Sequence, residues 1–131
     1  MFLDANIFIH AYDSTGQRFI SSRRLLSRIS KGEMNAKTSV LVLNEVLYFF
    51  SQKNGPDEGV RVFSNLRKTP HLEILGVEAS DMEHVPDLIT QGLDASDAYH
   101  AAVMRSNDIE TIFSYDKAFD KIKSIRRKEP V

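Results

Sequence analysis

The sequence contains no cysteine, and this absence excludes disulfide bonds, thiolate catalysis and thiolate zinc sites. A cytosolic setting is the simplest interpretation of such a chain. The sequence also lacks any apolar run close to the ~20 residues that a membrane span needs. Its first residues carry neither the basic region nor the cleavage site of a signal peptide. We therefore expect no membrane association.

Glycine is scarce, with six residues among 131, and no glycine-rich loop follows a predicted strand. The patterns of P-loop and Rossmann nucleotide binding are therefore absent. An aspartyl-phosphate phosphatase would carry a second Asp two residues after Asp4, but Asn6 occupies that position. A receiver domain has a similar layout, yet this chain has no acid pair just before a phosphoacceptor.

The net charge of −1 gives no indication of an anionic partner, but the charges are unevenly distributed. From Thr69 to Met104 there are seven acidic residues and no Lys or Arg. Basic clusters flank this stretch, one between Arg18 and Arg28 and one between Lys117 and Lys128. A fold that brings the flanks beside the acidic stretch would hold cations next to a polyanion. Solvated helix faces of opposite sign are an equally good alternative.

Short apolar runs alternate with longer amphipathic ones, which is typical of an α/β domain with a mainly parallel sheet. We expect one domain over residues 1–131, a three-layer α/β/α sandwich with four or five strands. Strands are predicted over 2–5, 36–38, 72–77 and 111–115, with a further short strand near Ile125. Helices are predicted over 7–12, 18–30 (with Ile20 inward), 40–53 and 57–68, and from Asp94 or Ser96. A further helix is predicted from a capping box at Ser80, with an apolar stripe of Met82, Val85, Leu88 and Ile89. Pro86 should kink this helix or move its start.

Four acidic residues stand in or beside apolar segments: Asp4, Glu45, Asp97 and Asp116. Asp4 and Asp116 follow predicted strands, and Glu45 and Asp97 lie near the starts of predicted helices. Because sites in parallel sheets form at the carboxyl ends of the strands, we expect the four to converge. No Lys or Arg lies within five residues of Glu45 or Asp97. A divalent cation such as Mg²⁺ would neutralise such a cluster.

Each acid also has an ordinary explanation when it is taken singly. Glu45 can extend to solvent from its helix, Asp97 can interact with the helix dipole, and Asp116 can begin a turn. Asp4 is the hardest to explain in this way, because it interrupts a strand at its end. The set of four is more specific than any member.

The motifs LDAN, a lone Glu45 within a helix, SDAYHAA and IFSYDKAFD follow one another along nearly the whole chain. This ordered set resembles the PIN-domain nucleases, and most of all the small VapC-like toxins of toxin–antitoxin pairs. The resemblance implies that Asp4, Glu45, Asp97 and Asp116 bind metal. Asn6 matches the small polar residue after the first Asp, and Ser114 stands where many relatives carry Thr. Asp94 is either an extra acid near the site or a helix cap, and we favour the cap.

The resemblance implies hydrolysis of RNA phosphodiesters with Mg²⁺ or Mn²⁺, and an antitoxin partner. A nuclease of RNA processing without an antitoxin, or a catalytically silent binding module, are the alternatives. Lys and Arg side chains would hold the RNA phosphates. The candidates are Arg18, Arg23, Arg24, Lys117, Lys121, Arg126, Arg127 and Lys128, although for each one alone a solvated surface position is the favoured interpretation.

Two further features remain. His100 lies three residues after Asp97, and His10 is also near the motif acids. We favour a packing or hydrogen-bonding role for both, because imidazole suits a hard cation less well than oxygen does. The segment LVLNEVLYFF is apolar nearly all round its helix, which indicates deep burial or a subunit interface. We expect a homodimer that uses this helix, with Tyr48, Phe49 and Phe50, or its neighbours.

Overall fold

Five short parallel strands form one sheet at the centre of the computed structural model, which describes residues 1–131. The strand order is β3-β2-β1-β4-β5. The strands are β1 (Phe2–Leu3), β2 (Ala36–Ser39), β3 (Leu72–Leu75), β4 (Thr111–Phe113) and β5 (Arg126–Lys128).

The order of the strands reverses beside β1, and this reversal positions the site. The chain moves outward from β1 to β2 and β3, then returns to place β4 on the other side of β1. Phe2 pairs with Lys37 of β2 and with Ile112 of β4. The segments that leave β1 and β4 therefore start next to each other at the carboxyl edge of the sheet, where α/β proteins bind their ligands.

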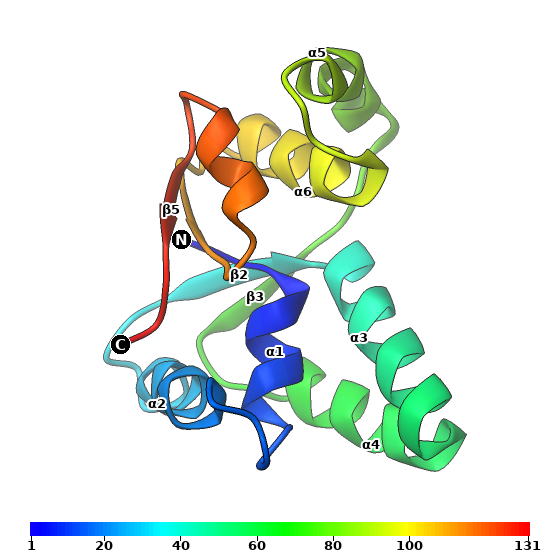
Figure 1. Cartoon of the computed structure of the whole chain (residues 1–131), viewed down its shortest axis with the longest axis vertical. Helices are drawn as coiled ribbons and strands as arrows, with labels where there is room; N and C mark the ends of the chain where they lie inside the picture. Colours follow the sequence, from blue (N-terminus) through cyan, green and yellow to red (C-terminus); the bar gives the residue numbers. More distant parts are fainter.

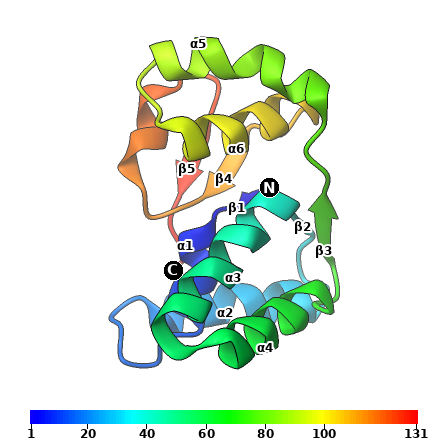
Figure 2. The same ribbon diagram turned by 90° about the vertical axis from the view of Figure 1, so that its right-hand side faces the viewer.

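Helices cover both faces of the sheet, as expected for an α/β/α sandwich. The four helices α1 to α4 lie on one side, and α5 and α6 lie on the other (Figures 1 and 2). Their bounds are α1 (Ala5–Ala11), α2 (Phe19–Ser30), α3 (Val40–Asn54), α4 (Pro56–Arg67), α5 (Val85–Thr90) and α6 (Ala95–Ser106), with 3₁₀ helices at Ala79–His84 and Lys117–Lys121. None of the helices combines the length and the hydropathy that a membrane span requires.

Burial on both faces explains the apolar start of the sequence. Phe2 and Leu3 point to opposite faces of β1, and both are wholly inaccessible to solvent. Strands covered on both sides are continuous hydrophobic runs rather than alternating ones. The charge of Asp4 therefore comes directly after a strand that is fully enclosed.

Several predicted helix ends are confirmed. The hydroxyl of Ser39 caps α3 by accepting a hydrogen bond from the Val42 backbone N–H at 3.2 Å. Gly32 follows the end of α2 with a φ of 78°, a conformation that glycine adopts without strain. Asp94 caps α6, which is the role favoured for it above.

The predicted helix from Ser80 is wrong in its start and in its buried face. Pro86 lies in the first turn of α5, so the helix begins at Val85, and a 3₁₀ helix capped by Glu78 precedes it. Met82 is therefore not on the same helix as Leu88 and is 54% exposed. Of the expected stripe, Leu88 alone is buried, and Ile89 is 43% exposed.

Ile20 also differs from its expected inward position, since 66% of its surface is exposed. The buried face of α2 is formed instead by Ser22, Leu25, Leu26 and Ile29. Ser22 lies inside because its hydroxyl pairs with the phenol of Tyr115 at 2.9 Å. A buried hydrogen bond therefore sets the rotation of this helix, which hydrophobic spacing alone does not indicate.

A glycine allows α3 and α4 to approach closely. A Cβ atom at Gly59 of α4 would overlap the Ser51 hydroxyl and lie 3.0 Å from backbone atoms of Leu47 and Ser51. The backbone of α3 cannot withdraw without moving the helix.

We expect Gly59→Ala to lower the free energy of unfolding by about 1–2 kcal/mol, because overpacking outweighs the gain in helix propensity. Asn65→Ala, at an exposed position of the same helix, is the matched control and should not destabilise. Urea denaturation measures both variants. A Gly59→Ala protein as stable as the control would show that α3 and α4 are not tightly packed here.

Candidate active site

Asp4 is the first residue after β1 and the N-cap of α1. Its backbone N–H donates to the Phe113 carbonyl at 3.1 Å, which continues the pairing with β4. Its side chain then turns to the helix start, where Oδ1 accepts a hydrogen bond from the Ala5 N–H at 2.8 Å. The carboxylate is almost completely buried. The end of the strand and the start of the helix together fix this side chain.

Asn6 and Ser114 hold the other oxygen of Asp4. Oδ2 accepts from the Ser114 hydroxyl at 2.6 Å and from the Asn6 amide at 3.1 Å. The amide also donates to Ser114 Oγ at 3.1 Å, and its oxygen accepts from the Tyr115 backbone N–H at 3.1 Å. This network joins α1 to the segment that leaves β4. Asn6 and Ser114, the two polar residues of the family motifs, therefore both contact Asp4 directly.

Asp97 reaches the same place from the first turn of α6. Its backbone N–H donates to Asp94 Oδ1 at 2.9 Å, so Asp94 fixes the helix start and is itself exposed. The side chain of Asp97 is half-buried, and one of its oxygens lies within 4.8 Å of donor atoms on Asp4 and His100. Asp97 belongs to the cluster, whereas Asp94 orients its helix.

Asp116 follows β4 and lies beside Asp97. Its backbone N–H donates to Ser114 Oγ at 3.0 Å, and its Oδ1 accepts from the Ala118 N–H at 2.9 Å. The Asp116 carboxyl group is close enough to Asp97 to contribute to the raised pKa of Asp97. Two carboxylates this close repel each other unless a proton or a cation lies between them. With a cation between them, the same two groups would be ligands.

Glu45 reaches the cluster through His100. Nε2 of His100 lies 3.1 Å from Glu45 Oε1 and 3.9 Å from Asp4 Oδ1. The imidazole is wholly buried, and its Nδ1 has no hydrogen-bonding partner. A metal-bound histidine almost always donates its second N–H, so this geometry favours hydrogen bonding over ligation. The three-residue spacing from Asp97 places His100 near the site but does not indicate its contact with Glu45.

Comparison with known proteins assigns this fold. A family model of the PIN domain matches residues 1–125. The chain belongs to the PIN-domain family. No curated protein sequence matches it significantly.

Solved structures with the same PIN fold include several toxin–antitoxin proteins. VapBC2 from Rickettsia felis, bound to a promoter DNA fragment, has a TM-score of 0.77 at 18% identity and covers 99% of this chain and 98% of its own. VapC20 from Mycobacterium tuberculosis, a sarcin-ricin loop cleaving toxin, has a TM-score of 0.75 at 19% identity, with 93% and 94% covered. A toxin–antitoxin complex from Klebsiella pneumoniae has a TM-score of 0.67 at 16% identity, with 95% and 94% covered.

The proximity of these carboxylates changes the protonation of the PIN-domain site. Burial, the charge of Asp4 and the proximity of Asp116 raise the pKa of Asp97 to about 8. Burial likewise raises the pKa of Asp4, and the hydrogen bond from Ser114 offsets only part of this effect. Burial alone would lower the pKa of His100, but the hydrogen bond to Glu45 and the charges of Glu45 and Asp4 raise it.

These shifts predict that stability falls with rising pH when a chelator is present. The folded site holds protons on Asp97, Asp4 and His100 more tightly than the unfolded chain does. The free energy of unfolding should therefore decline from about pH 4, near the ordinary pKa of Asp97, to about pH 8. Urea denaturation at a series of pH values in EDTA measures this slope.

Asp97→Asn should flatten the decline, because it removes a group whose pKa is raised from about 4 to about 8 in the folded protein. Glu83→Gln removes a charge at an exposed position outside the site and should keep the wild-type slope. Equal slopes for wild type and Asp97→Asn would contradict the raised pKa of Asp97 in the folded protein.

Proposed function

We propose that this protein is a divalent-metal-dependent endoribonuclease and the toxin of a toxin–antitoxin pair. The observation that carries the proposal is the convergence of Asp4, Asp97 and Asp116 at the switch point of the sheet, with Glu45 joined to them through His100. Four acids from separate segments meet there without any Lys or Arg among them.

The residues fit a hard divalent cation. Oδ2 of Asp4 accepts from Ser114 and Asn6, whereas Oδ1 accepts only the Ala5 N–H and lies 3.9 Å from Nε2 of His100. A carboxylate oxygen of Asp97 lies within 4.8 Å of potential ligand atoms on Asp4 and His100. Carboxylate oxygens are the ligands that Mg²⁺ and Mn²⁺ prefer. Asp4, Asp97 and Asp116 would hold the ion, which when bound lowers the pKa of a coordinated water and stabilises charge on a phosphate.

The other residues have supporting roles in this proposal. Glu45 would bind through water or orient the attacking water, and His100 would keep its carboxylate turned toward the cluster. Asn6 and Ser114 would fix the Asp4 carboxylate, since both bond to the oxygen that faces away from the ligands.

RNA as substrate and an antitoxin as partner are inferred from the similar structures. One of them is described as a toxin that cleaves the sarcin-ricin loop, and another as a toxin–antitoxin complex. A PIN-domain RNA-processing nuclease without an antitoxin remains the alternative. Growth arrest on expression of the wild type, but not of Asp97→Asn, would favour the toxin.

Cleavage of RNA by wild type and Asp97→Asn, with Mn²⁺, Mg²⁺ or EDTA, tests the catalytic proposal. We expect the substitution to lower the rate by about a hundredfold or more, because the loss of a ligand removes several kcal/mol of charge stabilisation. EDTA should abolish cleavage by the wild type, and Glu83→Gln should cleave normally.

Equal cleavage by wild type and Asp97→Asn would mean that the activity belongs to a contaminant or to another site. If no divalent ion raised the melting temperature of the wild type, the protein would instead be a silent PIN-fold binding module.

The homodimer is a further part of the proposal. Phe50 belongs to the core, but Val40 and Tyr48 lie on one exposed face of α3, and 67% of the surface of Tyr48 is accessible. An apolar cavity of about 270 Å³ opens beside this face between α3, α4 and β3. Light scattering at micromolar concentration should give a dimer, and Tyr48→Glu should give a monomer. A monomeric wild type would refute the dimer.

A further inference from the structure

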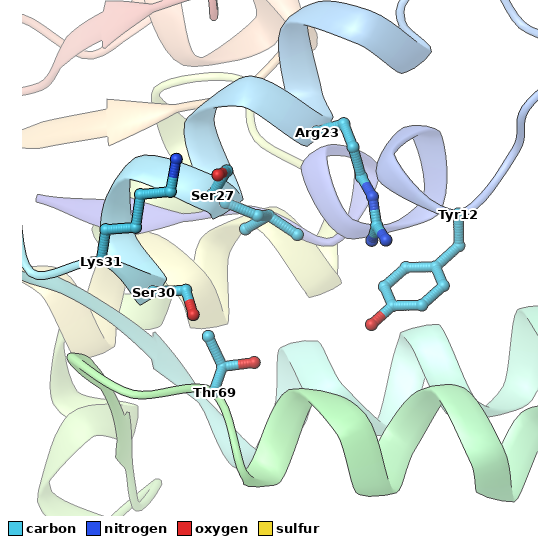
Figure 3. Close-up of a pocket in the computed structure, with 7 residues that line it drawn as sticks. Tyr12, Arg23, Ser27, Ser30, Lys31 and Thr69 are labelled. Carbon is cyan, nitrogen blue, oxygen red and sulfur yellow. The ribbon is translucent and has the colours of Figure 1, made fainter.

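A polar cleft lies on the α2 side of the molecule, away from the acidic cluster. It has a volume of about 420 Å³ and contains no carboxylate among its lining residues. Figure 3 shows Arg23 and Tyr12 extending into it from α2 and from the end of α1, with Ser30 and Thr69 at the opposite end. Its polar lining consists of Tyr12, Arg23, Ser27, Ser30, Lys31 and Thr69.

One stripe of α2 supplies most of this lining. Arg23, Ser27, Ser30 and Lys31 recur at helical spacing, so they face the same side. Arg23 and Lys31 form no ion pair, and the hydroxyls of Ser27 and Ser30 have no partner within the chain. This differs from Arg28 on the same helix, which pairs with Glu33 at 3.1 Å. Unpaired cations and free hydroxyls are suited to an anion.

A second arginine connects the cleft to the acidic site. The guanidinium of Arg18, at the start of α2, lies 4.3 Å from the ring centre of Tyr115. Tyr115 stands between Ser114 and Asp116 and donates its N–H to Asn6. Arg23 lies in the same way over Tyr12, at 5.3 Å. Each arginine thus lies over an aromatic ring, and both rings belong to segments that also carry residues of the acidic site.

The spacing of these residues along α1 and α2 suits successive phosphates of one RNA strand. Tyr12 follows Asp4 by eight residues along α1, which is about 12 Å of helix. Arg18 and Arg23 are five residues apart on α2, or about 7–8 Å. A chain that leaves the acidic site would therefore meet Arg18 first and Arg23 next. Glu129 lies close to Arg18 and Lys117, but Arg127 holds it at 2.7 Å.

The basic flank at the end of the sequence is less suitable. Arg127 is occupied by Asp120 and Glu129 and donates to the Ser114 carbonyl. Arg126 begins β5 and pairs with Thr111, so it lies at the opposite edge of the sheet from the site. Lys121 contacts the Gly92 carbonyl at 3.4 Å.

We propose that the substrate strand leaves the acidic site over Arg18 and that the α2 cleft, with Arg23, binds the phosphate of a neighbouring nucleotide. The inference rests on the proposed function and specifies which surface holds the RNA. Single-stranded RNA fits better than an acidic protein segment, because the partly exposed ring of Tyr12 lies beside Arg23, where it can contact a base next to the bound phosphate. The row of cations also continues from the place where a scissile phosphate would lie.

Binding of a labelled single-stranded RNA by the full-length Asp97→Asn protein tests the surface without cleavage. We expect Arg18→Gln and Arg23→Gln each to weaken binding by about tenfold at low salt, as loss of one charge-assisted contact predicts. The slope of log K against log salt concentration should decrease by about 0.7 for each lost phosphate contact. Fluorescence anisotropy at several salt concentrations gives both quantities.

Arg61→Gln, which removes an arginine paired with Glu58 on α4, and Arg126→Gln are the matched controls and should bind as the parent does. Parent-like RNA binding by both Arg18→Gln and Arg23→Gln would overturn the α2 surface alone and leave the nuclease proposal intact. An absence of RNA binding by the parent would contradict both. Loss of poly-glutamate binding with unchanged RNA binding would assign the cleft to an acidic protein segment instead.

Discussion

The structure depends on the placement of one buried carboxylate. Asp4 is the first residue after the central strand β1, at the edge of the sheet where the chain also leaves the neighbouring strand β4. A buried carboxylate without partners costs several kcal/mol, so its oxygens must be satisfied locally. The Ala5 N–H, the Asn6 amide and the Ser114 hydroxyl do this. Because these donors come from α1 and from the segment after β4, the same bonds that stabilise Asp4 also fix the local arrangement of the site.

The other acids of the site lower the stability of the folded protein. Asp97 lies beside Asp4 and Asp116, and its pKa is raised by burial and by repulsion from the charge of Asp4. His100 is the only basic group in the cluster, and it is directed at Glu45 rather than at Asp97. The fold thus assembles negative charge that its own residues do not neutralise. Sites of this kind are commonly functional, because packing alone gives no reason to retain them.

Much of this site could be predicted from the sequence because it depends on strand ends. Asp4 and Asp116 are identified by the apolar runs before them, and parallel pairing brings them together whatever the detailed packing. The Glu45–His100 contact joins two helices that are distant in the sequence, so no spacing predicts it. The same holds for the bond between Ser22 and Tyr115, which rotates α2 and exposes Ile20. The start of α5 could not be predicted, because a proline such as Pro86 can either kink a helix or begin one.

The rotation of α2 determines where the basic residues between Arg18 and Arg28 lie, which the sequence alone does not show. Because Ser21 and Ser22 bond to the Tyr115 phenol, α2 is held against the segment that carries Asp116. This contact places Arg18 on the Tyr115 ring and turns the stripe that begins at Arg23 toward Tyr12. At the other flank Arg127 is neutralised by neighbouring acids. Two basic clusters that look equivalent along the chain therefore differ in the folded protein. In the cluster beside the acidic site, Arg18 and Arg23 are exposed and form no ion pair. A polyanion that must approach a cluster of carboxylates needs cations in that state.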